Sequence, residues 1–415
     1  MEKLVGNAIF GQSGGPTAVI NSSAAGVIIT ALQQEGVIEK VYGAAHGIVG
    51  MLNEEFFDMA EEDMKELELL KTTPSSMLGS CRYKLANADE DDTDYKRLLE
   101  VFKKYNIRYF FYNGGNDSMD TCNKVSKYMQ KVGYDCRVMG VPKTIDNDLY
   151  GTDHCPGFSS AAKYIATSCM EIYQDGRVYN TGQVVIVEIM GRNAGWLAAA
   201  AGLAAYAGSG PDFIYLPEVS FDLEKVFADI KQRYEEAGNC IIAVSEGVTD
   251  ADGKYLPELI GTVKTDAFGH KQMGGTAQVI ADYIADRMDV KIRHIELSLL
   301  QRAAAHYASK SDVEEAFMAG KLAVEKAVEG YTDYMIGFER KSNDPYECEY
   351  ILVPLEKVAN TEKMVPREWI NEAGNGIEQG YIDYCLPLIQ EVSSTPTENG
   401  LPRYARLKKV LAKKD

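Results

Sequence analysis

Short apolar runs alternate with segments of helical periodicity along most of the chain. Residues 4–10 form an apolar run that ends in glycines, and residues 17–34 follow with apolar side chains at helical spacing. This order predicts a strand, a tight turn and a helix. Residues 107–112 and 119–131 repeat the order. Repeated alternation of this kind predicts an α/β fold with mainly parallel sheets covered by helices on both faces.

The alternation predicts two series of elements. In the first series the remaining strands are expected at 41–45 and 136–141, and the remaining helices at 60–70 and 95–105. Beyond residue 151 we expect strands at 183–189, 212–216, 240–245 and 290–297, and helices at 159–174, 194–207, 223–236 and 276–287. A polar, glycine-containing connection at 249–275 precedes the last helix and strand. A chain of 415 residues is too long for one small core, so two domains are expected.

The composition of the chain argues against several kinds of binding partner. The formal net charge is −18, and the only short basic stretch is at 406–414, which argues against nucleic acid and against an anionic membrane surface. The eight cysteines include no Cys-x-x-Cys pair, and no histidine is spaced to complete a zinc site. The N-terminus lacks the basic and apolar regions of a leader, so a cytoplasmic protein is expected.

Candidate chemistry is concentrated just after the strand at 136–141. Pro142-Lys143-Thr144-Ile145-Asp146-Asn147-Asp148 supplies a cation, a hydroxyl and two carboxylates. If the segment is extended, Asp146 and Asp148 share one side, and one can act on a hydroxyl while the other supports it or a metal. Lys143 suits phosphate oxygens. Asp-Asn-Asp is also typical of a surface turn, so the heptapeptide alone leaves both interpretations open.

Two glycine loops lie at the ends of predicted strands. Gly11-Gln12-Ser13-Gly14-Gly15 and Gly114-Gly115-Asn116-Asp117-Ser118 each precede a helix. Glycines let backbone N–H groups approach an anion, and the helix N-terminus adds partial positive charge. Neither loop is Gly-x-Gly-x-x-Gly, which excludes a dinucleotide-binding dehydrogenase.

Four motifs together resemble the phosphofructokinase family in their order and spacing. They are the two glycine loops, the heptapeptide and Met190-Gly191-Arg192-Asn193-Ala194-Gly195. The resemblance runs from about residue 5 to residue 305, with a fainter match at 353–389. It implies two Rossmann-like three-layer α/β/α domains with the active site in the cleft between them. It also implies that 1–150 plus about 276–305 bind the phosphoryl donor, and that about 151–275 plus 306–415 bind the sugar phosphate.

The resemblance assigns roles residue by residue. It implies that the catalytic residues are Asp146, Lys143, Asp117 and Arg192. It implies that the sugar phosphate is bound by Thr144, Ile145, Asp148, Met190, Gly191, Glu246, Arg293 and Arg302. It implies that the diphosphate is bound by Gly14, Arg82, Gly115 and Ser118. Asp146 would be the general base for the sugar 1-hydroxyl. Arg293 would come from a neighbouring subunit, which implies a homodimer or homotetramer.

Three positions point away from a nucleotide. Within the family, Ile48 stands where an adenine-stacking tyrosine is expected, and Asp117 and Lys143 replace two glycines. A carboxylate fills and repels the α-phosphate position, and a lysine supplies charge to a small donor. Both changes are typical of the pyrophosphate-dependent branch.

Three other positions depart from the family pattern. Asn116 replaces an acid that orients Mg²⁺, Leu299 replaces a histidine, and Gln183 an arginine. Asn116 can still hold Mg²⁺ through its carbonyl or through water.

The sequence therefore predicts a phosphotransferase that moves phosphoryl from pyrophosphate to fructose 6-phosphate, reversibly, with Mg²⁺. Two alternatives stay open: an ATP-dependent 6-phosphofructokinase that tolerates Asp117, and a non-catalytic regulatory subunit that binds sugar phosphate. Intact Asp146, Thr144, Lys143 and Arg192 count against the second.

Overall fold

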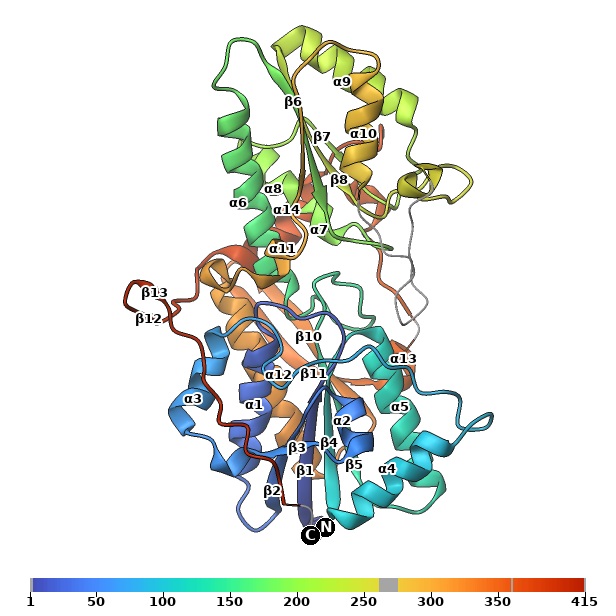
Figure 1. The fold of residues 1–415 in the computed structure, drawn as a ribbon, viewed down its shortest axis with the longest axis vertical. Helices are drawn as coiled ribbons and strands as arrows, with labels where there is room; N and C mark the ends of the chain where they lie inside the picture. Colours follow the sequence, from blue (N-terminus) through green and yellow to red (C-terminus); the bar gives the residue numbers. More distant parts are fainter. Residues whose placement is uncertain (1–2, 261–274, 360, 414–415) are drawn as a thin grey trace.

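A computed structural model describes residues 3–260, 275–359 and 361–413. Figure 1 shows two lobes, each built on one sheet. The large lobe holds a seven-stranded sheet and the small lobe a four-stranded sheet, as far as the chain is described. Most of the polar connection predicted at 249–275 lies outside the described residues.

The large lobe contains the N-terminal strands and two strands from late in the chain. Its strands are β1 (Gly6–Gln12), β2 (Ile38–Ala44), β3 (Phe56–Asp58), β4 (Ile107–Gly114), β5 (Arg137–Pro142), β10 (Tyr334–Asn343) and β11 (Tyr346–Pro354). Its helices are α1 (Ile20–Leu32), α2 (Ile48–Asn53), α3 (Met64–Leu69), α4 (Thr93–Lys104), α5 (Asn116–Lys131), α12 (Lys310–Glu329) and α13 (Leu355–Val358). The strand order is β11-β10-β5-β4-β1-β2-β3. Strands β2, β1, β4, β5 and β10 run parallel, and β3 and β11 add antiparallel edges.

Helices cover both faces of the large sheet. Helices α1 and α12 pack on one face, and α2, α4 and α5 on the other. Two glycines allow α1 and α12 to touch. A Cβ at Gly26 would lie 2.1 Å from the Phe317 carbonyl oxygen, and one at Gly320 would lie 2.1 Å from that of Ser23. Helix α12, from the C-terminal third of the chain, is therefore part of the large lobe's core.

The small lobe is a parallel sheet of order β7-β8-β6-β9. Its strands are β6 (Gln183–Ile189), β7 (Phe213–Tyr215), β8 (Asn239–Ser245) and β9 (Ile292–Glu296). Its helices are α6 (Phe158–Gly176), α7 (Trp196–Ala199), α8 (Ala201–Tyr206), α9 (Leu223–Ala237), α10 (Thr276–Ala285), α11 (Leu300–Ala303) and α14 (Gln379–Cys385). A separate two-stranded ribbon is formed by β12 (Thr397–Glu398) and β13 (Leu401–Pro402).

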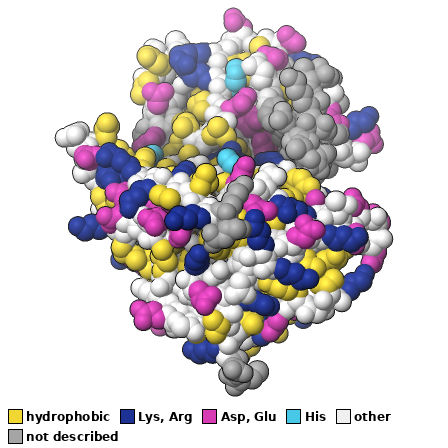
Figure 2. Space-filling model, turned by 60° about the horizontal axis from the view of Figure 1, so that its bottom comes forward, with side chains coloured by type: hydrophobic (Ala, Val, Ile, Leu, Met, Phe, Trp, Pro, Cys, Tyr) yellow, Lys and Arg dark blue, Asp and Glu magenta, His cyan; other side chains and the backbone are white. Residues whose placement is uncertain are grey.

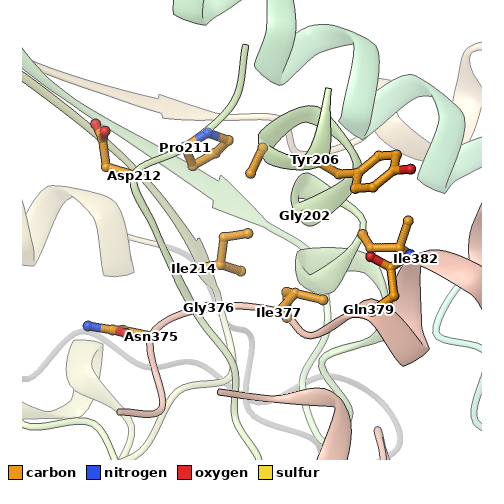
Figure 3. A pocket seen from close by; sticks show the side chains of 11 residues that line it. Gly202, Tyr206, Pro211, Asp212, Ile214, Asn375, Gly376, Ile377, Gln379 and Ile382 are labelled. Carbon is orange, nitrogen blue, oxygen red and sulfur yellow. The ribbon is translucent and has the colours of Figure 1, made fainter. Parts of the chain in front are cut away.

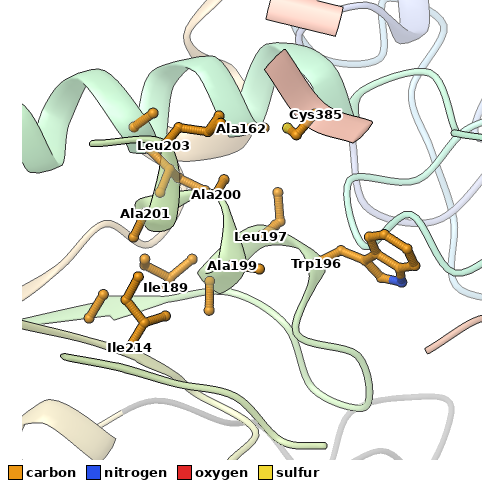
Figure 4. Packing of buried hydrophobic residues seen from close by; sticks show 14 of the residues in the cluster. Ala162, Ile189, Trp196, Leu197, Ala199, Ala200, Ala201, Leu203, Ile214 and Cys385 are labelled. Atoms are coloured by element: carbon orange, nitrogen blue, oxygen red, sulfur yellow. The ribbon is translucent and has the colours of Figure 1, made fainter. Parts of the chain in front are cut away.

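Small side chains pack the small lobe closely. Figure 4 shows Leu197, Ala199, Ala200 and Ala201 between Ile189 of β6 and helix α6. The apolar run predicted as one helix at 194–207 is instead two short helices that meet at Ala200. All of α7 and the first four residues of α8 are buried, and their alanines allow the backbone to approach the sheet.

The predicted exchange of segments between the domains is wrong. Strand β9 pairs with β6, so the segment 276–305 contributes its strand to the sheet of the small lobe and not to that of the large lobe. Conversely, α12, β10 and β11 join the large lobe, because β10 extends the sheet beside β5. Of the elements after residue 305, α14 packs in the small lobe, as predicted. Among the described residues, no helix is long and apolar enough to cross a membrane.

Candidate active site

A cleft of about 620 Å³ lies between the lobes and gathers residues from both. In the space-filling view of Figure 2 the surface is hollowed between the upper and lower lobes. The predicted residues that line the cleft are Gly14, Arg82, Gly115, Asn116, Asp117, Ser118, Lys143, Thr144, Ile145, Asp146, Asp148, Met190, Arg192, Glu246 and Arg302. The carboxyl ends of β1, β4 and β5 point into it from one side and the ends of β6 and β8 from the other, as open parallel sheets bind ligands.

The glycine loops bring backbone close to the cleft. Gly14 has φ +75°, a conformation that glycine adopts without strain. At Gly114 a Cβ would lie 2.0 Å from the Ser118 hydroxyl oxygen, so only glycine allows α5 to begin there. Helix α5 starts at Asn116, three residues earlier than predicted, which places Asn116 and Asp117 in its first turn.

Lys143 links the loops. Its backbone N–H donates to the Gly114 carbonyl at 3.0 Å, and its ammonium donates to the Gly15 carbonyl at 2.5 Å. Burial lowers the pKa of Lys143 to about 8, and the neighbouring charges of Arg302 and Arg82 act in the same direction, against Asp146. The site therefore holds a desolvated cation that gains stability when an anion binds.

The acidic segment is not extended at Asn147, although an extended segment was the condition under which Asp146 and Asp148 were expected to share one side. Asn147 has φ +56° and is fully buried. Its side-chain N–H donates to the Tyr384 hydroxyl at 2.7 Å, and its carbonyl oxygen accepts from the Cys155 backbone N–H at 3.0 Å. With Asn147 held in the core, Asp146 and Asp148 both line the cleft.

Both carboxyl groups hold protons more tightly than usual. Burial, followed by the negative charge of Glu246, raises the pKa of Asp146 to about 6. Burial, followed by the charges of Asp146 and Glu362, raises the pKa of Asp148 to about 7. Because the two groups interact, they titrate as a pair. A carboxylate with a pKa near neutral pH is suited to accept a proton from a hydroxyl.

The opposite wall comes from the small lobe. Gly191 has φ +141°, and its N–H donates to Glu246 Oε1 at 3.3 Å, while its carbonyl accepts from the Ser245 hydroxyl at 2.5 Å. These contacts fix the loop that carries Met190 and Arg192. Gly191 therefore supports the wall and is not among the described lining residues.

Arg302 connects the two walls. It belongs to the short helix α11, and a Cβ at Gly15 would lie 2.8 Å from one of its guanidinium nitrogens. Burial and the charge of Arg82 lower the pKa of Arg302. Four predicted cations, Arg82, Lys143, Arg192 and Arg302, thus line a cleft that also contains the carboxylate pair. This arrangement is suited to phosphate groups.

The structure adds residues that the sequence prediction missed, and it leaves Arg293, like Gly191, outside the described lining. Lys84 lines the cleft with its ammonium 3.8 Å from Asp117 Oδ1, and Glu362 lines it beside Asn193. Lys84 lies two residues after Arg82, so proximity in sequence could have indicated it. Glu362 had no local signal. Arg293 is exposed on the edge strand β9 and is not among the described lining residues.

Two oxygen atoms in the cleft suit a hard cation. Asn116 Oδ1 and Asp148 Oδ1 are buried and accept no hydrogen bond from the described residues, while Asn116 Nδ2 donates to Asp148 Oδ2 at 3.0 Å. Among the described residues, no group of three or more histidine, cysteine or acidic side chains is arranged for a metal. An amide and a carboxylate oxygen match an ion that takes its other ligands from water and phosphate.

A second pocket, of about 300 Å³, lies in the small lobe (Figure 3) and shares no lining residue with the cleft. Its floor is apolar, with Ile214, Ile377 and Ile382. Two of its polar side chains are already paired: Asp212 accepts from Arg233 at 2.7 Å, and Asn375 donates to Asp229. The pocket therefore presents little unsatisfied polar chemistry.

Comparison with known proteins agrees with this site. Residues 7–296 match the family model described as phosphofructokinase. A relative from Halomonas elongata, named pyrophosphate–fructose 6-phosphate 1-phosphotransferase, is 45% identical over 406 residues, 97% of this chain and 96% of the relative. A relative of the same name from Methylococcus capsulatus is 44% identical over 404 residues, 97% of this chain and 96% of the relative.

A solved structure shares the whole architecture. The crystal structure of pyrophosphate-dependent phosphofructokinase from Marinobacter aquaeolei superimposes with a TM-score of 0.89 at 41% identity, covering 99% of this chain and 98% of that one. The fold defines a two-lobed α/β protein of the phosphotransferase class. The chain belongs to the phosphofructokinase family, and the predicted fold class is confirmed.

The raised pKa of Asp146 predicts that kcat falls on the acidic side of the pH–rate profile, a region called the acid limb below. A reaction that uses this carboxylate as a proton acceptor needs its ionised form, so kcat should fall about tenfold per pH unit below the apparent pKa. Glu246→Gln removes a negative charge that disfavours ionisation of Asp146, and should move the limb to lower pH. Initial rates measured between about pH 5 and about pH 9 check both effects. A limb that stays in place, or moves to higher pH, would contradict this assignment.

Proposed function

We propose that this protein transfers phosphoryl from pyrophosphate to the 1-hydroxyl of fructose 6-phosphate, giving fructose 1,6-bisphosphate and phosphate, in both directions, as a step of glycolysis. The observation that carries the proposal is the cleft in which Asp146 lies with five cations contributed by both lobes, the four predicted ones and Lys84. The named activity of relatives that span nearly the full chain supports it.

Asp146 accepts the proton of the 1-hydroxyl as that oxygen attacks the phosphorus of the donor. The bond between phosphorus and the bridging oxygen breaks, and phosphate leaves. Lys143 and Arg192 neutralise charge on the transferring group and on the donor. Catalysis of this kind depends on positioning and charge more than on covalent chemistry. The presence of all these side chains in one cleft argues against a non-catalytic subunit.

The donor side of the cleft favours pyrophosphate over ATP. Asp117 lines the cleft in the first turn of α5, and Ile48 is fully buried, with its N–H bonded to the Tyr112 hydroxyl at 3.2 Å. A buried isoleucine offers no surface for an adenine ring. A carboxylate about 4 Å from an α-phosphate charge costs on the order of 4 kcal/mol at an effective dielectric near 20. Together these features disfavour the ATP-dependent alternative.

Mg²⁺ fits the free oxygens of Asn116 and Asp148. When bound, the ion would neutralise phosphate charge. We also assign the protein to the cytoplasm, with which its eight free cysteines are consistent.

The position of Arg293 supports a homodimer or homotetramer. Arg293 lies on an exposed sheet edge, followed by two exposed apolar side chains, Leu299 and Leu300. An exposed arginine on such an edge can contact a second copy of this chain. In this proposal it binds the sugar 6-phosphate in the cleft of the neighbouring subunit, together with that subunit's Arg302.

An assay with two donors tests the function. Purified protein with fructose 6-phosphate and Mg²⁺ should form fructose 1,6-bisphosphate with pyrophosphate and negligibly with ATP. Asp146→Asn keeps the shape and removes the proton acceptor, so kcat should fall by roughly 10²–10⁴-fold with little change in sugar-phosphate affinity. Product is measured by a coupled assay. Activity with ATP alone, or wild-type turnover in the variant, would refute the respective part of the proposal.

Donor choice should change when Asp117 and Lys143 change. Asp117→Gly removes the repulsion, which by the estimate above is worth roughly a thousandfold in affinity, and Lys143→Gly removes charge that pyrophosphate needs. We expect the double variant to lose most pyrophosphate activity and gain weak ATP activity. Steady-state kinetics with both donors checks this, with Lys127→Gly on α5 as the control. An unchanged preference for pyrophosphate would mean that these residues do not select the donor.

Subunit mixing tests the shared site. Asp146→Asn and Arg293→Ala proteins should each be inactive, and exchange of subunits should restore a fraction of activity, because some clefts then contain both native residues. The control uses an Arg287→Ala protein in place of the Arg293→Ala protein. Arg287 is an exposed arginine just after α10, so this control protein should be active by itself. Absence of recovery despite exchange, verified by mass spectrometry of tagged subunits, would place Arg293 outside a shared site.

A further inference from the structure

A short segment from the C-terminal part of the chain, Glu362–Val365, borders the active-site cleft. Its Lys363 N–H donates to the Asp148 carbonyl at 2.8 Å, and Glu362 forms a bridge with Leu149. Its Lys363 carbonyl accepts from the Trp196 indole N–H at 2.7 Å. The segment therefore bonds to the loop of the carboxylate pair and to the start of α7. It lies beyond residue 296, where the match to the family model ends.

Lys363 anchors this segment. Its ammonium donates to the Asp153 carbonyl at 2.7 Å and to the Thr152 carbonyl at 3.2 Å, and lies 5.0 Å from the centre of a Trp196 ring. Farther along, the Val365 N–H donates to Glu218 Oε1 at 3.0 Å, and the Gly195 N–H donates to the same oxygen at 2.8 Å. The backbone of Glu362 is thereby held beside Asp148.

The Glu362 carboxylate lines the cleft itself. Its Oε1 accepts from the Asn193 side-chain N–H at 2.7 Å, and Asn193 follows Arg192 in the small-lobe loop. A carboxylate has about four lone-pair sites, so this bond leaves capacity to accept others. Its charge disfavours a phosphate group nearby, whereas a hydroxyl donates to a carboxylate favourably. Among ligands of this cleft, the chemical groups that meet this description are sugar hydroxyls.

We propose that Glu362 is a binding residue for a hydroxyl of the sugar acceptor, held in place by the anchored segment Glu362–Val365. The proposal rests on the proposed function, because it takes a phosphorylated polyol as the acceptor. It assigns a role in acceptor specificity to the C-terminal part of the chain. In this proposal the cations of the cleft bind the charged ends of the substrates, and Glu362 binds the uncharged part between them.

The test compares the kinetic constants of the two substrates. Glu362→Ala removes an ionised acceptor, so KM and Kd for fructose 6-phosphate should rise about 10- to 100-fold, as for loss of a hydrogen bond to a charged group. KM for pyrophosphate should change less than about twofold. Glu362→Gln keeps an acceptor oxygen, so its KM and Kd for fructose 6-phosphate should lie between those of wild type and those of Glu362→Ala. Glu368→Gln, an exposed acid in the same part of the chain, is the matched control and should behave as wild type.

Analogues of fructose 6-phosphate that each lack one hydroxyl sharpen the test. One analogue should bind poorly to wild type yet lose little further affinity in Glu362→Ala, since the contact is already absent. Additive losses for every analogue, an unchanged sugar Kd, or equal effects on both substrates with a lowered melting temperature would overturn the proposal. Absence of wild-type activity with pyrophosphate would refute the proposed function, whereas direct binding of the sugar phosphate, measured by calorimetry without donor, still tests Glu362.

Discussion

The arrangement of the site depends on the buried side chain of Asn147. A left-handed backbone conformation is unfavourable for most residues but is tolerated by asparagine. Here the side chain stabilises it by bonding the Tyr384 hydroxyl and the Cys155 N–H. The two flanking aspartates are thereby directed into one cleft. Because Tyr384 belongs to α14, from the C-terminal part of the chain, the acidic segment of the large lobe is held by a helix that packs in the small lobe.

A buried charged network continues from this contact. The Tyr384 hydroxyl donates to the Asp153 carbonyl at 2.8 Å, and the Asp153 carboxylate accepts from Arg340 at 2.8 Å and pairs with His154 at 2.8 Å. His154 also pairs with Glu315 at 2.7 Å, and these partners raise its pKa to about 9 despite burial. The imidazole is therefore positively charged at neutral pH. Breaking such a pair leaves an uncompensated buried charge, so the network fixes how the loop after Asp148 sits on α12 and β10.

The buried charges of the cleft lower the stability of the free protein. Burial lowers the pKa of Lys143 and of Arg302 and raises that of Asp146, so each charged form is disfavoured in the free protein. A phosphate group beside the cations would supply the missing counter-charge. The same burial that costs folding energy therefore strengthens the interaction with an anionic substrate, because charges attract more strongly where water is excluded. Stability lost at the site is offset by the packed apolar faces of the two sheets.

The sequence by itself determined the α/β class, the two glycine loops and the residues of the acidic segment, because these features are encoded by neighbours in the chain: apolar periodicity, turn glycines and charged residues just past a strand. The resemblance to the phosphofructokinase family added the arginines Arg82, Arg192 and Arg302 to the predicted site. Only the tertiary structure decided that β9 pairs with β6, that β10 joins β5, that Asn147 faces inward, and that Lys84 and Glu362 reach the cleft. Strand order and contacts between distant segments arise from packing of whole surfaces, and Glu362 meets Asp148 only after both lobes and the C-terminal segment have assembled.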